Sequence, residues 1–367
     1  MAEKRLTSLD AFRGMTIAGM ILVNNPGSWE SVYPLLRHAD WHGWTPTDLV
    51  FPFFLYIVGI SISLSLTVRK THGFSDCQCA IKIARRTLIL FGLGLLLNLI
   101  PAFDFGAVRI PGVLQRIAVC YLAAALLFLK TSIKTRLLMA LGILISYWLI
   151  LTYVPVPSLG AGILTQEGNL CAYIDTRLLG GHLYKPGFDP EGILSTFPAI
   201  ATTLLGTLCG DWLRVSPNRA VAAAGLLASG IVLFISGHVL APFFPVNKQL
   251  WTSTYVLLTA GAASIVMGVC CTFLDGYKLK RWALPFLVFG GNAITVYVGS
   301  SLLAKMMGAI TIRVDINTLS LKDFLFECFF SPLSGDYFGS LLFPIILLLF
   351  WFLILLPMHR KNIHVKI

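Results

Sequence analysis

Ten long apolar runs divide this sequence of 367 residues, and each is of a length that can cross a bilayer as a helix. Only 12% of the residues are charged, about half the fraction usual in soluble proteins, which excludes a soluble enzyme. The runs therefore predict an all-α polytopic membrane protein, with about ten transmembrane helices in one bundle and a single domain over residues 1–367. The predicted spans are 7–25, 47–68, 82–100, 112–129, 135–154, 190–213, 219–240, 250–274, 282–304 and 338–357.

The distribution of Lys and Arg predicts the orientation of these spans. If the N-terminus is inside, 18 of the 28 basic residues fall in inside segments and 8 in outside segments. Both termini are then cytoplasmic, and the net charge of +11 reflects orientation in the membrane, so we expect no nucleic-acid partner. The larger outside loops lie near 26–46, 155–189 and 305–337. None of the nine asparagines begins an N-x-S/T sequon, which favours a bacterial inner membrane with the first loop in the periplasm.

The first outside loop is the most distinctive stretch of the chain. Residues 24–48 read NNPGSWESVYPLLRHADWHGWTPTD and combine three tryptophans with two histidines and several carboxylates. Tryptophan is common where a membrane meets water, so the aromatic residues alone indicate only depth. His38 is a candidate general base, because an imidazole titrates near neutral pH. The alternative for His38, and more so for His42, is an ordinary hydrogen-bonded residue of the surface.

Two acidic segments lie at predicted helix starts. Thr45-Pro46-Thr47-Asp48 has the pattern of a capping box with proline at the first helical position. Asp48 could cap the second span, orient the imidazole of His38, or do both. Asp189 and Glu191 flank a first-turn proline at the start of the sixth span, where an N-cap and a favourable helix dipole explain them. As carboxylates at an outer mouth, they are also candidate contacts for a cationic amine.

Polar residues inside the apolar runs need partners, since an arginine at the bilayer centre costs about 2.5–3.5 kcal/mol. Arg13 and Arg116 lie near the ends of their spans and could extend to the surface, or could face the interior and hold a polar or anionic ligand. Asn24 and Asn292 could form bonds between helices or belong to a site.

The eight cysteines indicate no metal site or redox motif, and we expect no bound metal. Cys77 and Cys79 form a C-x-C that does not fit zinc or thioredoxin spacing. Cys171 and Cys328 both fall in predicted outside loops, so a disulfide between them stays open. No Walker loop, H-E-x-x-H or G-x-S-x-G occurs, and spacing alone does not name a reaction.

Six blocks, in order along the chain, resemble the heparan-alpha-glucosaminide N-acetyltransferases and their bacterial homologues, a family of transmembrane acyltransferases. They are RLTSLDAFRGMTIAGMILVNN at 5–25, LRHADWHGWTPTDLVFPFFLYIVGISI at 36–62, RIPGVLQRIAVCY at 109–121, YKPGFDPEGILSTFPAI at 184–200, FPVNKQLWTSTYVL at 244–257 and GGNAITVYVG at 290–299.

The resemblance implies transfer of an acetyl group from cytosolic acetyl-CoA to an amino sugar on the far side of the membrane. The catalytic histidine of the family falls on His38, and Asp48 and Asn24 also match residues of the family. The count of basic residues likewise predicts that His38 lies on the far side of the membrane. We further expect two groups of binding residues. The co-substrate acetyl-CoA would contact Arg13, Gln115, Arg116 and Asn292, and the glucosamine-type acceptor would contact Asp189, Glu191, Lys248 and Trp251.

Several alternatives stay open at this point. The acetyl group could pass directly within a ternary complex or through an acetyl-histidine. A sugar permease would also use many spans and buried polar groups. An O-acyltransferase acting on envelope glycans would keep His38 and change the nucleophile. The acceptor itself and assembly into a homodimer are not fixed by the sequence.

Overall fold

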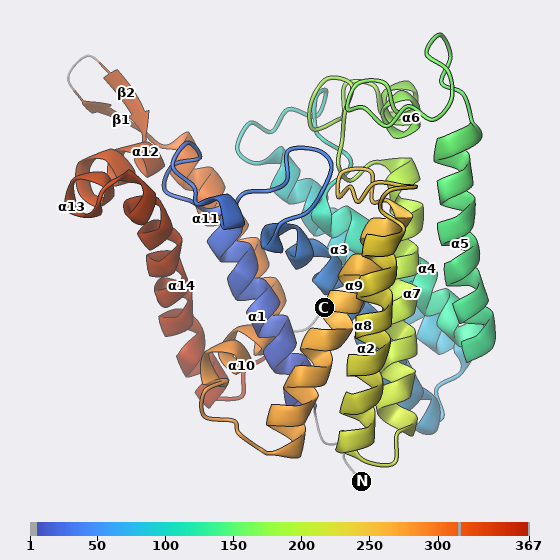
Figure 1. Ribbon diagram of the computed structural model, residues 1–367. Helices are drawn as coiled ribbons and strands as arrows, with labels where there is room; N and C mark the ends of the chain where they lie inside the picture. Colours follow the sequence, from blue (N-terminus) through green and yellow to red (C-terminus); the bar gives the residue numbers. More distant parts are fainter. Residues whose placement is uncertain (1–5, 315–316, 366–367) are drawn as a thin grey trace.

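The protein is a bundle of long helices with short loops at one end and longer, structured loops at the other (Figure 1). The computed structural model describes residues 6–314 and 317–365. Nine of the ten predicted spans coincide with one long helix each. The helices are α1 (Thr7–Asn24), α2 (Val50–Thr71), α3 (Asp76–Leu99), α4 (Val113–Lys130), α5 (Ile133–Tyr153), α6 (Leu170–Leu179), α7 (Ile193–Val215), α8 (Arg219–Val239), α9 (Ser253–Cys270), α10 (Leu284–Gly291), α11 (Ala293–Ala309), α12 (Leu321–Leu325), α13 (Ser331–Ser334) and α14 (Asp336–Arg360).

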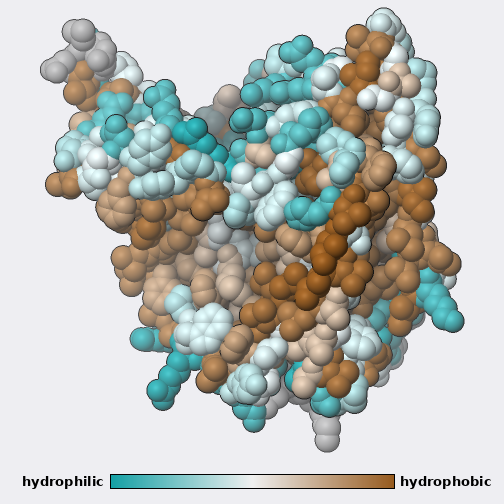
Figure 2. Space-filling model, viewed as in Figure 1, coloured by the Kyte–Doolittle hydropathy of each residue, from teal (hydrophilic) through white to brown (hydrophobic). Residues whose placement is uncertain are grey.

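Apolar side chains form a band around the middle of the molecule, with hydrophilic residues towards both ends (Figure 2). Within the described residues, seven helices are long and apolar enough to cross a membrane, and the bent pair α10–α11 makes an eighth. α1 and α3 are long enough but less apolar, since α1 carries Asp10 and Arg13 and α3 carries several Lys and Arg residues. The protein is therefore an integral membrane protein of helices, while the prediction of ten spans is not confirmed.

The ninth predicted span, residues 282–304, is wrong as a single helix. α10 and α11 meet at an angle of 83°. Asn292 lies at this break, where its buried amide donates to the Ile363 carbonyl at 3.1 Å and accepts from the Val365 N–H at 2.9 Å. The segment after α14 thus returns to the bundle and binds at the bend.

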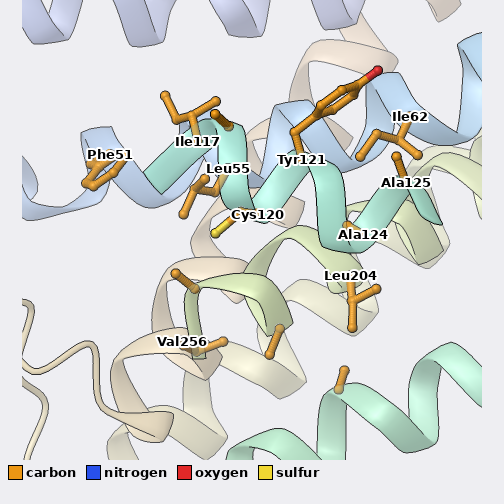
Figure 3. Packing of buried hydrophobic residues seen from close by; sticks show 14 of the residues in the cluster. Phe51, Leu55, Ile62, Ile117, Cys120, Tyr121, Ala124, Ala125, Leu204 and Val256 are labelled. Atoms are coloured by element: carbon orange, nitrogen blue, oxygen red, sulfur yellow. The ribbon is translucent and has the colours of Figure 1, made fainter. Parts of the chain in front are cut away.

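The largest apolar core lies between α2, α4, α7 and α9. Leu55 of α2, Ala124 of α4 and Leu204 of α7 are fully buried there (Figure 3). α2 and α7 approach closely at Gly59 and Gly206, because a Cβ on either glycine would collide with the main chain of the other helix. This close approach joins the middles of the two helices; the first residues of α2 border the site described below.

The three longer loops lie at one end of the bundle, as predicted (Figure 1). Residues 155–189 contain α6, and residues 305–337 contain the antiparallel hairpin β1 (Thr311–Val314) and β2 (Asn317–Ser320) followed by short helices. Trp41 fastens the first loop to the second, since its indole N–H donates to the Leu164 carbonyl at 2.7 Å. Cys171 is buried, Cys328 is exposed and both are free, so the disulfide considered from the sequence is absent.

Candidate active site

A cavity of about 510 Å³ opens where α1, α2 and the longer loops meet, a volume usual for a small-molecule site. Its floor is apolar and includes Met20, Phe54 and Tyr297. Two groups of polar residues line it. One contains Asn24, His38, Asp40, Lys248 and Gln249, and the other contains Arg109, Gln166, Tyr184, Lys185 and Glu191.

The first group centres on a histidine–aspartate pair. His38 Nδ1 lies 2.7 Å from Asp48 Oδ1, and the Asp48 side chain is only 1% exposed whereas that of His38 is 39% exposed. The second carboxylate oxygen accepts from the N–H groups of Ala39 at 3.1 Å and Thr45 at 3.0 Å. These donors stabilise an ionised carboxylate. Because an ionised carboxylate can only accept a hydrogen bond, the neutral imidazole carries its proton on Nδ1. The lone pair is then on Nε2.

Local sequence explains why the loop holds this geometry. Thr45 and Asp48 form the predicted capping box at the 3₁₀ turn Pro46–Leu49, which leads directly into α2. Asp48 therefore both caps the helix and orients His38. The main-chain carbonyl of Asp48 also accepts from the hydroxyl of the buried Tyr255 on α9. Asn24, the last residue of α1, is exposed to the same cavity.

Lys248 completes this group from the turn between α8 and α9. Its Nζ lies 2.9 Å from His38 Nδ1, 3.3 Å from Nε2 and 3.3 Å from Asp48 Oδ1. Burial lowers the pKa of Lys248, and the nearby carboxylates Asp48 and Glu191 oppose that shift. The turn is held by Asn247, which is fully buried, accepts from the Leu250 N–H at 2.8 Å and donates to the Trp41 carbonyl at 2.8 Å.

The second group of polar residues centres on Arg109, which our sequence analysis did not place in the site. Its guanidinium donates two hydrogen bonds to the Asp189 carboxylate, at 2.8 and 2.7 Å, and also contacts Glu191. Burial alone would lower the pKa of Arg109, but Asp189 and Glu191 together raise it. The Asp189 side chain is completely buried and further accepts from the N–H groups of Tyr184 and Glu191 at 2.9 Å. The Asp189 side chain therefore holds Arg109 in place without lining the cavity, whereas Glu191 lines the cavity.

Gln115 and Arg116, predicted to bind acetyl-CoA, lie outside the cavity lining. Both are at most 4% exposed, since Arg116 packs against the start of α7 and Gln115 against Gly94 of α3. The Arg116 guanidinium donates to Ser195 Oγ and to the Gly192 carbonyl, and lies over the ring of Trp251. Its position supports packing of α4 on α7 and provides no direct contact with a ligand in the cavity.

Three further predicted contacts also lie elsewhere. Arg13 binds Asp10, the Gly290 carbonyl and Ser61, and so joins α1 to α10 and α2. Asn292 is engaged by the segment after α14. Trp251, 1% exposed, packs beneath the cavity against Phe51 and Tyr255 and has a left-handed backbone, with φ 52°. That turn directs Trp251 into the core and leaves Lys248 at the cavity.

Comparison with known proteins identifies similar sequences. Residues 5–245 match the family model described as heparan-alpha-glucosaminide N-acetyltransferase, catalytic. The mouse protein named heparan-alpha-glucosaminide N-acetyltransferase is 32% identical over 359 residues, covering 82% of this chain and 54% of that protein. The human protein of the same name is 33% identical over 356 residues, covering 80% of this chain and 52% of that protein.

The chain spans about half the length of these curated relatives. The family match nevertheless covers the first loop with His38 and Asp48, as well as Arg109, Asp189 and Glu191. On that extent of similarity, this chain belongs to the heparan-alpha-glucosaminide N-acetyltransferase family.

Proposed function

We propose that this protein transfers the acetyl group of acetyl-CoA to the amine of a glucosamine-type sugar, with His38 as the catalytic base. The observation that carries the proposal is the His38–Asp48 pair, in which a buried carboxylate orients an imidazole exposed to a cavity. The name of the family supplies the reaction class, an N-acetyl transfer, for which acetyl-CoA is the implied donor.

The chemistry needs a base at this position. An amino sugar carries an ammonium near neutral pH, and an ammonium cannot attack a thioester. The Nε2 lone pair of His38 can take that proton, because Nδ1 is bound to Asp48. Protonation then produces an imidazolium beside a carboxylate that stabilises it. Asn24 lines the same cavity and is our candidate donor to the oxyanion of the tetrahedral intermediate.

We place the donor and acceptor on opposite sides of His38. In our scheme acetyl-CoA enters from the cytoplasmic side, with its pantetheine arm along the apolar floor formed by Met20, Phe54 and Tyr297. The sugar approaches from the outer loops, where Glu191 and Lys248 face the cavity. Direct transfer and an acetyl-His38 intermediate both fit this arrangement, and rapid quench of labelled protein distinguishes them.

Product analysis of the purified protein in detergent tests the proposal. With acetyl-CoA and glucosamine we expect N-acetylglucosamine, an amide that survives mild base. A base-labile ester would instead identify an O-acyltransferase. Uptake of labelled glucosamine by sealed vesicles without acetyl-CoA, together with no acetylated product, would replace the proposal with transport.

A further inference from the structure

The cavity contains an amine of the protein itself beside the catalytic base. Lys248 Nζ lies within 3.3 Å of both ring nitrogens of His38, and Lys248 lines the same cavity as His38. Nδ1 already donates to Asp48, so the lone pair of the ring is on Nε2, which lies 3.3 Å from Lys248 Nζ. A rotation of the flexible lysine side chain is enough to bring the two groups together.

Lys248 therefore has the chemistry of the proposed acceptor. Both are primary ammonium groups that must lose one proton before they can attack a thioester. Burial lowers the pKa of Lys248, which raises the fraction of free amine available at a given pH. Lys185 offers a contrast within the same cavity, because its Nζ lies over the ring of Tyr184, 5.9 Å from the centroid.

We propose that Lys248 is a site of self-acetylation when no sugar is present, an inference that rests on the proposed function. His38 Nε2 takes a proton from the Lys248 ammonium, and the amine attacks the thioester carbonyl of acetyl-CoA. The new amide N–C bond forms as the C–S bond breaks, and the CoA thiolate takes the proton from the His38 imidazolium. One further proton is released, so acetyl-lysine, free CoA and a proton are the products.

Self-acetylation has a defined consequence for the site. An acetylated Lys248 has no charge to place beside Asp48, and its added acetyl group occupies space next to His38. The modified protein is therefore inactive in transfer to sugar. A bound amino sugar protects Lys248, since the sugar amine must occupy the same place near Nε2.

Mass spectrometry of the whole chain and of its peptides tests this inference. Purified protein is incubated with acetyl-CoA, with or without glucosamine, and is then assayed for transfer. Without glucosamine we expect the mass of one acetyl group on Lys248, none on Lys185, and a loss of activity in proportion to the modified fraction. Glucosamine slows both changes. Lys248→Arg keeps the positive charge, lacks the nucleophile and gains no acetyl group.

The outcomes separate this inference from the proposed function. Formation of N-acetylglucosamine with an unmodified Lys248 overturns self-acetylation and leaves the proposed function standing. Equal acetylation of Lys248 in wild type and His38→Ala, or equal acetylation of Lys185, shows reaction without the catalytic base and also overturns it. If neither sugar nor lysine is acetylated, the proposed function fails, and the inference fails with it.

Discussion

Two buried aspartates beside one cavity have similar hydrogen-bond partners. Asp48 accepts from the N–H groups of Ala39 and Thr45, and Asp189 accepts from those of Tyr184 and Glu191. Each also binds side chains that reach the cavity: His38 and Lys248 in the first case and Arg109 in the second.

The difference lies in what those side chains can do with a proton. An imidazole gains and loses a proton near neutral pH, whereas a guanidinium in a protein stays charged. In our proposal the His38–Asp48 pair therefore exchanges a proton, whereas the Arg109–Asp189 ion pair stays charged. A buried carboxylate at the cavity is thus not enough to indicate catalysis, because its partner decides the role.

Replacing Asp48 by asparagine should have the largest effect on activity. An amide at this position can donate to Nδ1, which favours the wrong tautomer of His38 and removes the charge that stabilises the imidazolium. We expect kcat to fall roughly 10²- to 10⁴-fold. Steady-state kinetics with acetyl-CoA and glucosamine measures the change, and Asp48→Glu provides the charged control. Wild-type kcat in Asp48→Asn would show that the two aspartates are equivalent, and our comparison would fail.

Replacing Arg109 by alanine should chiefly reduce stability. The variant leaves Asp189 buried without its cation, which costs about 3–5 kcal/mol when one partner of a buried pair is removed. We expect a clearly lower thermal unfolding temperature in detergent. Arg109→Lys retains a charge but cannot form both bonds to Asp189, so it should fall between wild type and alanine. An unfolding temperature of Arg109→Ala equal to that of wild type would show that the ion pair with Asp189 does not stabilise the fold.

A third buried carboxylate gives the smallest predicted effect. Asp175 of α6 accepts from the Ile193 N–H at 2.8 Å, and within the described residues its other oxygen has no hydrogen-bond partner. Burial, helped by Asp189, raises the pKa of Asp175 from 3.8 to about 6 against the opposing Ile193 bond. The folded protein thus binds more protons than the unfolded chain between these values, and this contribution to stability is lost as pH rises through about 6.

Thermal unfolding between pH 4 and pH 7 checks this sign. Asp175→Asn should remove the contribution, so the stability of wild type relative to the variant should fall as pH rises across that window. A difference of about 1–3 kcal/mol is expected. A wild type that gains stability relative to the variant with rising pH would show that Asp175 has a cation partner as Asp189 does.

Sequence analysis could place His38 beside Asp48 because the two residues are close in the chain. His38 and Asp48 share one loop, and Thr45-Pro46 marks the helix start that positions the carboxylate. Arg109 was missed because its partners lie 80 and 82 residues away, and nothing in the local sequence names them. Asn247 was missed likewise, although an asparagine in a turn between two spans was a usable signal.

Other differences concern polar residues inside helices. Arg116 and Gln115 were expected to face a ligand, but apolar periodicity does not show which neighbouring helix a polar side chain meets. Arg116 binds Ser195 of α7, and Gln115 packs against Gly94 of α3. The bend at Asn292 had a local signal in Gly290-Gly291, which weakens a helix. Its stabilising partner, residues 363–365, comes from more than 70 residues further along.

The most direct test of our account compares wild type with His38→Ala in acetyl transfer to glucosamine, with acetyl-CoA binding measured on the same preparations. We predict N-acetylglucosamine from wild type, none above background from His38→Ala, and similar acetyl-CoA binding by both, because the imidazole acts on the amine and does not hold the donor. A His38→Ala protein that forms product at the wild-type rate would contradict the account.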